Sequence, residues 1–254
     1  MRLRVIGCAG GSAPGERLSC YLLDERFAID AGALTTGLQL DEQRAIEAVA
    51  FTHGHLDHVW SLPLFLANRF GSTAPTCHVH ACVYTMETIR KHLFNDRIWP
   101  DFTAAKDAGR DIVNFHDIEP DETQQVLDTY EITAIPLNHA VPCQAYLVRR
   151  EGRSVLICGD TCTTDRVWEV ANQTDDLQAV LIECSFPDKL EDLAVLSGHM
   201  TPNLLLADLQ KLARDIPVHI MHMKPGYAET VCDELLAGGD ARVHFLTQGD
   251  VLDI

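Results

Sequence analysis

The 254-residue sequence predicts an α/β protein in which two mixed β-sheets are covered by outer helices. Short apolar segments typical of strands cluster in each half of the chain, and segments with helical spacing lie between them. Sheet packed on sheet, with helices outside, buries the apolar face of every element. No repeat, low-complexity tract or Pro/Gly/Ser-rich linker divides the chain. We therefore expect a single domain over residues 1–254.

In the N-terminal half, strand patterns come first and helix patterns follow. The segment "CYLLDERFAID" predicts a β-hairpin that turns at Asp24 and Glu25. Apolar residues recur at helical spacing in "SLPLFLANRF" and "YTMETIRKHLF", and "HVHACV" between them predicts a strand. The other strands expected here are "RLRVIG" and "AVAFT".

Strands dominate the C-terminal half. Those expected are "VLDTYEITAIPL", "CQAYLVRREGRSVLICGD", "LQAVLIEC" and "IPVHIMHM", and "RVHFLTQGDVLDI" ends the chain as β-structure. One helix is expected over "TPNLLLADLQKLARD", with Thr201 before it and Pro202 in its first turn, where proline is favoured.

Composition narrows the possible partners and location. A net charge of −17 with only 20 Lys and Arg residues, none in a basic run, argues against long nucleic acid and anionic membranes as partners. The nine cysteines show no CxxC spacing, and the N-terminus lacks the apolar core of a signal peptide. We expect a cytoplasmic protein with reduced cysteines.

Crowded metal-binding side chains follow the strand "AVAFT". The segment "THGHLDH" contains His53, His55, Asp57 and His58 where a buried strand leads into a helix. Imidazoles and carboxylates suit zinc, manganese or iron, and four such groups exceed what one open catalytic zinc ion needs. The alternative is a solvated loop, but the apolar flanks make four unpartnered polar groups costly to bury. The pattern therefore predicts two metal ions.

"THGHLDH" resembles the HxHxDH motif of the metallo-β-lactamase fold, an αββα sandwich, and the other motifs of that fold follow in order. "FAIDAG" supplies Asp30, which the resemblance makes a supporting residue rather than a ligand. "NHAVP", "LICGDT" and "HIMHMKP" supply three further ligands, His139, Asp160 and His222. The resemblance implies two divalent ions, with zinc expected first and manganese or iron as alternatives. One ion would be held by His53, His55 and His139, the other by Asp57, His58 and His222, with Asp160 bridging them.

Within this fold, the chain resembles the class II 3′,5′-cyclic-nucleotide phosphodiesterases. The matching segments are "HGHLDHVWSLP", "IDAGALTTGL", "LFNDRIWPDF" and "HMKP", whereas Cys143, Cys162 and Ser61 depart from the pattern. The resemblance implies hydrolysis of cyclic AMP or cyclic GMP to the 5′-monophosphate by a metal-bound hydroxide. The alternatives are a ribonuclease Z-like endonuclease acting on RNA 3′ ends, another hydrolase such as a lactonase, or a noncatalytic metal-binding module.

Further residues are candidates for catalysis and substrate binding. Asp57 is a candidate both as a metal ligand and as a catalytic residue. The segment "LSGHMTPNLLL" contains His199, which resembles a GHxT histidine and would protonate the leaving group. Glu183 would orient His199. A surface histidine and carboxylate are the alternative for this pair. Between the second and third motifs, Asn95 and Trp99 are expected to contact the nucleotide, although Trp99 could instead pack the loop or form a homodimer contact.

Three other patterns favour structural explanations. "TCHVHAC" is expected to be an ordinary strand rather than a metal site, because adjacent residues of a strand face opposite sides. Gly7, Gly10, Gly11 and Gly15 predict a glycine-rich hairpin near the active site rather than a phosphate loop. His116, His219 and His244 lack polar neighbours in the sequence and are expected at the surface or in the core.

Overall fold

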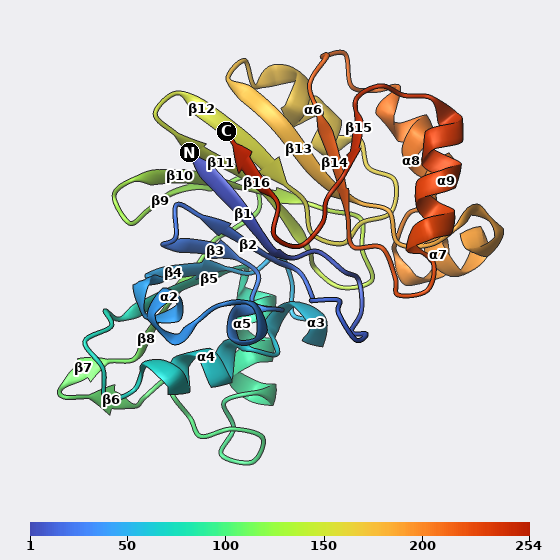
Figure 1. Ribbon diagram of the computed structural model, residues 1–254. Coiled ribbons are helices and arrows are strands. Elements are labelled where there is room, and N and C mark those ends of the chain that lie inside the picture. The colour runs from blue at the N-terminus through green and yellow to red at the C-terminus, as the bar shows by residue number, and fades with distance from the viewer.

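The computed structural model describes residues 1–254 and contains two seven-stranded sheets that face each other (Figure 1). In the first sheet, the parallel strands β3, β4, β5 and β8 continue an antiparallel set. Its strands in spatial order are β16 (Val251–Asp253), β1 (Arg2–Gly7), β2 (Cys20–Leu23), β3 (Phe27–Ile29), β4 (Ala48–Ala50), β5 (Cys77–Ala81) and β8 (Val113–Asp117).

The second sheet is also mixed, with one parallel and one antiparallel half. Its order is β15 (Val243–Phe245), β14 (Val218–Met221), β13 (Leu177–Glu183), β12 (Arg153–Ile157), β11 (Gln144–Arg150), β10 (Tyr130–Pro136) and β9 (Thr123–Val126). A separate two-stranded ribbon consists of β6 (Lys106–Asp107) and β7 (Arg110–Asp111).

Helices lie on the outer sides of both sheets, in agreement with the expected arrangement (Figure 1). The first sheet is accompanied by α1 (Leu34–Gly37), α2 (Leu40–Ala45), α3 (Leu56–Val59), α4 (Leu62–Arg69) and α5 (Val83–His92). The second is accompanied by α6 (Arg166–Gln173), α7 (Glu191–Ser197), α8 (Pro202–Leu209) and α9 (Ala228–Gly238), with a short 3₁₀ helix at Asp188–Leu190. No helix combines the length and the apolar character needed to cross a membrane.

Successive side chains of a strand point to opposite faces of the sheet, and this separates the hydrophobic core into two clusters. In β4, Ala48 and Ala50 face the second sheet and belong to a cluster of 42 buried residues, whereas Val49 faces the helices in a cluster of 23. The interior strand β13 is buried on both faces, as its continuous apolar sequence predicts. These two clusters hold the carboxyl ends of the parallel strands in place, and those ends carry the polar motifs.

Most expected elements are present, and their differences from prediction have local causes. The hairpin turns at Asp24 and Glu25, both with positive φ, within a three-residue connection between the paired residues Leu23 and Phe27. The helix after Thr201 ends at Leu209 rather than extending to residue 215, because Arg242 donates hydrogen bonds to the carbonyl oxygens of Leu209 and Leu212. Strands β6, β7, β8 and β9 and helices α1, α2, α6, α7 and α9 were not predicted.

Candidate metal centre and active site

The conspicuous histidines and carboxylates of the sequence meet at one edge of the molecule. Parallel strands end at the same edge of a sheet, so the residues that follow them lie close together. His53 follows β4, Asp160 follows β12, Glu183 ends β13 and His222 follows β14. Three more residues come from α3 and its N-cap, and His139 from the connection between β10 and β11. Segments far apart in sequence thus build one site.

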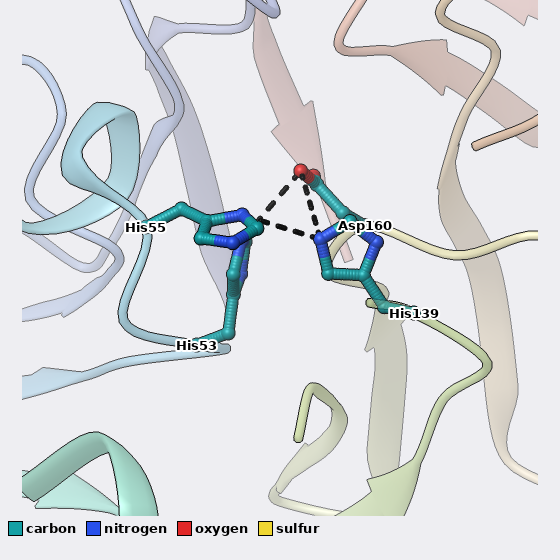
Figure 2. A group of neighbouring side chains, drawn as sticks. All are labelled: His53, His55, His139 and Asp160. Carbon is teal, nitrogen blue, oxygen red and sulfur yellow. Dashed lines mark hydrogen bonds and ion pairs between the residues drawn. The ribbon is translucent and has the colours of Figure 1, made fainter. Parts of the chain in front are cut away.

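One group consists of His53, His55, His139 and Asp160, whose ligand atoms all lie within 4.8 Å of one another. Figure 2 shows the imidazoles of His55 and His139 facing each other, with the Asp160 carboxylate beside them. His139 Nε2 lies 3.2 Å from His55 Nδ1, and His53 Nε2 lies 3.6 Å from Asp160 Oδ2. The four side chains therefore point their donor atoms at a common centre.

The second group consists of Asp57, His58, His222 and again Asp160. His58 Nε2 and His222 Nε2 are 3.2 Å apart and lie 3.4 and 3.3 Å from Asp160 Oδ1. Asp57 Oδ2 is 3.5 Å from His222 Nε2. The two oxygens of Asp160 thus face different groups, Oδ1 this one and Oδ2 the histidines of the first, which is the geometry of a bridging carboxylate.

These side chains fit divalent metal ions. His53 Nε2 is buried and has no hydrogen-bond partner, although an unpaired buried polar atom is costly. Burial lowers the pKa of His53 and His55, which leaves these rings in the neutral form that metals bind. Burial opposes the charge of Asp160, yet His222 and His58 hold its pKa well below the ordinary value. The neutral rings of His53 and His55 beside the ionised carboxylate of Asp160 are a suitable donor set.

Further residues hold the ligands in orientation. Asp30 Oδ2 accepts a hydrogen bond from His58 Nδ1 at 2.7 Å and belongs to neither ligand group, which agrees with its expected supporting role. Thr52, which sequence reasoning missed, binds both oxygens of Asp30 through its backbone N–H and its hydroxyl. His139 Nδ1 donates to the carbonyl oxygen of Gly198 at 2.8 Å. Such contacts set the tautomer of a metal-binding histidine.

His199 and Glu183 form a hydrogen-bonded pair beside the second group. His199 Nδ1 lies 2.6 Å from Glu183 Oε1, and the histidine ring stacks on that of His222. Burial alone would lower the pKa of His199, but the Glu183 carboxylate raises it above the ordinary value. Ser185, also missed from the sequence, donates to Glu183 Oε2 at 2.6 Å and lies 3.1 Å from His222 Nδ1. It thereby links the pair to a ligand.

Comparison with known proteins agrees with this geometry. A model of the family described as class-II cAMP phosphodiesterases matches residues 38–227, most of the chain. The chain belongs to this family. The matched residues include both ligand groups, Glu183 and His199.

Curated relatives of the family resemble the chain moderately. A probable 3′,5′-cyclic-nucleotide phosphodiesterase of Yersinia pestis is 27% identical over 239 residues, covering 82% of this chain and 68% of the relative. A 3′,5′-cyclic-nucleotide phosphodiesterase of Schizosaccharomyces pombe is 28% identical, covering 73% of this chain and 56% of the relative. The chain therefore spans only part of the length of these relatives.

Solved structures confirm the predicted fold. Unliganded yeast PDE1 superposes with a TM-score of 0.83 at 19% identity, covering 100% of this chain and 99% of the other. The metallo-β-lactamase fold protein YhfI of Bacillus subtilis superposes with a TM-score of 0.81 at 18% identity, covering 99% of each chain. The arrangement of two mixed sheets between helices is thus the metallo-β-lactamase fold.

The glycine-rich segment around Gly7, Gly10, Gly11 and Gly15 lies beside the candidate metal centre, as the sequence predicts. Ala13 and Glu16 form an isolated antiparallel bridge, and Ala9 bridges Met223, next to His222. A Cβ atom on Gly10 would lie 2.2 Å from the His222 carbonyl oxygen, so only glycine fits there. The segment packs against the candidate ligand His222 and is followed by strand β2 rather than by a helix. This agrees with the expected glycine-rich hairpin near the site.

The segment after α5 differs from the sequence interpretation. Asn95 Oδ1 accepts hydrogen bonds from the N–H groups of Arg97 and Ile98, and its Nδ2 donates to the Lys91 carbonyl oxygen, so its amide closes a turn. Trp99 is half-buried and packs against the helix-side core. Ile98, which lies between them, is 66% exposed. Nucleotide contacts by Asn95 and Trp99 stay predictions, and the structure gives both residues a local packing role.

The structure also places the segment "TCHVHAC" and the three histidines expected to be structural, His116, His219 and His244. Cys77 and His78 do face opposite sides of β5, as expected of an ordinary strand. His116 is half-buried, and its Nε2 lies 2.9 Å from His78 Nδ1 across β5 and β8, a polar contact that its sequence neighbours did not indicate. His219 and His244 lie on β14 and β15 with ring centroids 5.5 Å apart.

Proposed function

We propose that the chain is a metal-dependent phosphodiesterase that hydrolyses 3′,5′-cyclic nucleotides to 5′-monophosphates. Membership of the class II family supports the substrate class. The observation that carries the mechanism is the carboxylate of Asp160, which turns one oxygen toward each histidine group. Because the whole site is formed by this chain, a small cyclic phosphodiester could be bound and cleaved without a second protein.

Two divalent ions would occupy the two groups. His53, His55 and His139 would hold one ion, and Asp57, His58 and His222 the other, with Asp160 shared. We expect zinc, with manganese or iron as alternatives, because imidazole and carboxylate donors suit these ions. When bound, such a pair neutralises charge on the phosphate and lowers the pKa of a water molecule.

Side chains of the protein would supply the proton that the leaving group needs. Hydrolysis to a 5′-monophosphate adds water to phosphorus and breaks the bond to the 3′ oxygen, which must gain a proton. Glu183 accepts the Nδ1 hydrogen of His199, so Nε2 of the same ring is left to transfer a proton to that oxygen. Glu183 also accepts the N–H of Thr161 at 2.8 Å, which anchors the carboxylate.

The nucleobase has an apolar surface available beside the metal ligands. Leu56 stands between His55 and Asp57 and is 65% exposed. A hollow of about 470 Å³ beside it is lined by Leu56, Asp57 and Trp60, among others. Trp60 Nε1 donates to the Gly32 carbonyl oxygen and so fixes the ring.

Leu56 also lines a second hollow, of about 350 Å³, together with Leu93 and Ile98. We place the base against Leu56 and the face of Trp60, because stacking on an aromatic ring contributes about 1–3 kcal/mol. This assignment replaces Trp99 by Trp60 as the residue that stacks on the base.

We also infer that residues 1–254 work as one domain in the cytoplasm on a small-molecule substrate, without long nucleic acid or membrane. The net charge of −17 supports the last two points. The sequence leaves open whether the chain forms a homodimer. Size-exclusion chromatography with light scattering measures it.

The test of the function is an assay of chelator-treated protein after addition of zinc, manganese or iron. Hydrolysis of cyclic AMP or cyclic GMP to the 5′-monophosphate, restored by metal, is the expected result. Cleavage of a precursor tRNA without turnover of cyclic nucleotides would instead identify a ribonuclease Z-like enzyme. Metal uptake without hydrolysis of any phosphodiester would indicate a metal-binding module.

A further inference from the structure

A polar groove of about 830 Å³ lies between the free edges of the two sheets, away from the catalytic side chains. Its walls come from β5 and the edge strand β8 of the first sheet and from β9, the edge strand of the second. His78, His80 and His116 project into it, and we call it the histidine groove. No member of either ligand group of the catalytic site lines it.

The histidines occupy positions that a sandwich normally fills with apolar residues. His78 and His80 are paired with Ala48 and Ala50 of β4, and those alanines belong to the core between the sheets. The alternate residue Val79 faces the helices instead. Two imidazoles on the inner face of a sheet therefore replace hydrophobic core contacts, which calls for a compensating interaction.

Contacts within the groove bring nitrogen atoms together. His78 Nδ1 lies 2.9 Å from His116 Nε2. The ring of His116 stacks on that of His80 with centroids 4.7 Å apart and an angle of 16° between the planes. His80 is only 5% exposed, and its Nδ1 has no hydrogen-bond partner. The cluster therefore contains one close nitrogen pair and one buried nitrogen that nothing in the protein satisfies.

The surrounding charges favour a cation as ligand. Arg26 is the one cationic side chain of the groove, and its Nε lies 2.6 Å from Glu47 Oε1. The carboxylates of Asp117 and Asp128 also line the groove and leave it net negative when the histidines are neutral. Such surroundings repel phosphate and attract a cation.

We propose that the histidine groove binds a divalent first-row transition ion through His78 Nδ1 and His116 Nε2. Imidazole nitrogens bind such ions at about 2.0–2.1 Å, so two nitrogens 2.9 Å apart subtend roughly 90° at a shared ion. Nickel and copper favour that angle, whereas tetrahedral zinc requires a wider one. His80 holds the ring of His116 by stacking. The competing explanation is a hydrogen bond between two neutral rings.

Metal counting separates the two explanations. Protein loaded with its catalytic metal is dialysed against low micromolar Ni²⁺, and nickel per chain is measured by mass spectrometry. Wild type is expected to bind one more nickel ion than His116→Gln or His78→Gln, with cyclic-nucleotide turnover unchanged. The matched control is His244→Gln, because His244 pairs with His219 across two strands without a nitrogen contact. Equal nickel content in all four proteins overturns the proposal.

A second measurement needs no variant. Carbethoxylation by diethyl pyrocarbonate modifies accessible histidines, and peptide mass spectrometry gives the rate at each one. Ni²⁺ should slow modification of His78 and His116 at least fivefold and leave the exposed His244 unchanged. Unprotected His78 and His116 would show that the pair is only a hydrogen bond, even if a variant failed to fold.

Discussion

Replacing His199 with alanine tests the proton transfer. Its partner Glu183 is fully buried and accepts hydrogen bonds from His199 Nδ1 and Ser185 Oγ at 2.6 Å and from the N–H of Thr161 at 2.8 Å. A general acid contributes about 10²- to 10⁴-fold, so His199→Ala should lower kcat on cyclic AMP by that factor. Glu183→Gln keeps the ring but removes a charge-assisted bond of about 1.5–3 kcal/mol. That loss corresponds to about 10- to 150-fold in kcat.

The assay compares two leaving groups at saturating substrate. Bis-p-nitrophenyl phosphate releases a phenolate that needs no proton, so both variants should hydrolyse it at close to the wild-type rate. Metal content and melting temperature are measured on the same preparations, and His244→Ala is the control for loss of a histidine outside the site. Equal losses on both substrates would refute the assignment of His199 as proton donor and indicate a role in structure or binding. Lost metal would make His199 a ligand.

Three further predictions concern other parts of the molecule. Asp160→Ala should abolish activity and reduce the metal content measured by mass spectrometry, because its two oxygens face different ligand groups; full metal content with normal turnover would contradict this. Trp60→Ala should raise KM for cyclic AMP roughly 5- to 100-fold but leave hydrolysis of bis-p-nitrophenyl phosphate unchanged. Trp99→Ala should mainly lower the melting temperature. The reverse pattern would identify Trp99 as the residue that stacks on the base. Burial, with His244 nearby, lowers the pKa of His219 from 6.5 to about 4 in the folded protein. Between these two pH values the unfolded chain therefore binds more protons than the folded protein does. The free energy of unfolding should consequently decrease as pH falls from about 6.5 to 4. Denaturant unfolding of His219→Gln should show a smaller loss than wild type over that range, and parallel curves would reject the idea.

Local sequence patterns predicted much of the site because the ligands follow buried strands. The apolar runs "AVAFT" and "LICG" are each followed directly by a candidate ligand, His53 and Asp160, and parallel strands end at the same edge of a sheet. The resemblance to known motifs then connected them to His139 and His222. Ser185 and Thr52 carried no comparable signal, because a single hydroxyl gains its role only from the distance to a distant carboxylate.

The segment after α5 shows why a sequence pattern could not decide which side chains face outward. Asn95 and Trp99 looked suitable for nucleotide contacts, since polar and aromatic residues occur together in binding loops. In the structure the Asn95 amide closes a turn and Trp99 packs on the core, which leaves Ile98 facing outward. The choice between a side chain turned inward and one turned outward depends on the neighbouring helices, which are not adjacent in sequence.

The sequence by itself determined the fold class and the hairpin at Asp24 and Glu25, because periodicity and turn chemistry are properties of short segments, and its resemblance to known motifs indicated the seven candidate ligands. Only the tertiary structure decided which oxygen of Asp160 faces which group, that Ser185 links Glu183 to His222, and that His116 meets His78. These depend on distances between strands that pack together only after the two sheets have formed. Such distances are set by the burial of the whole core, and no local pattern contains them.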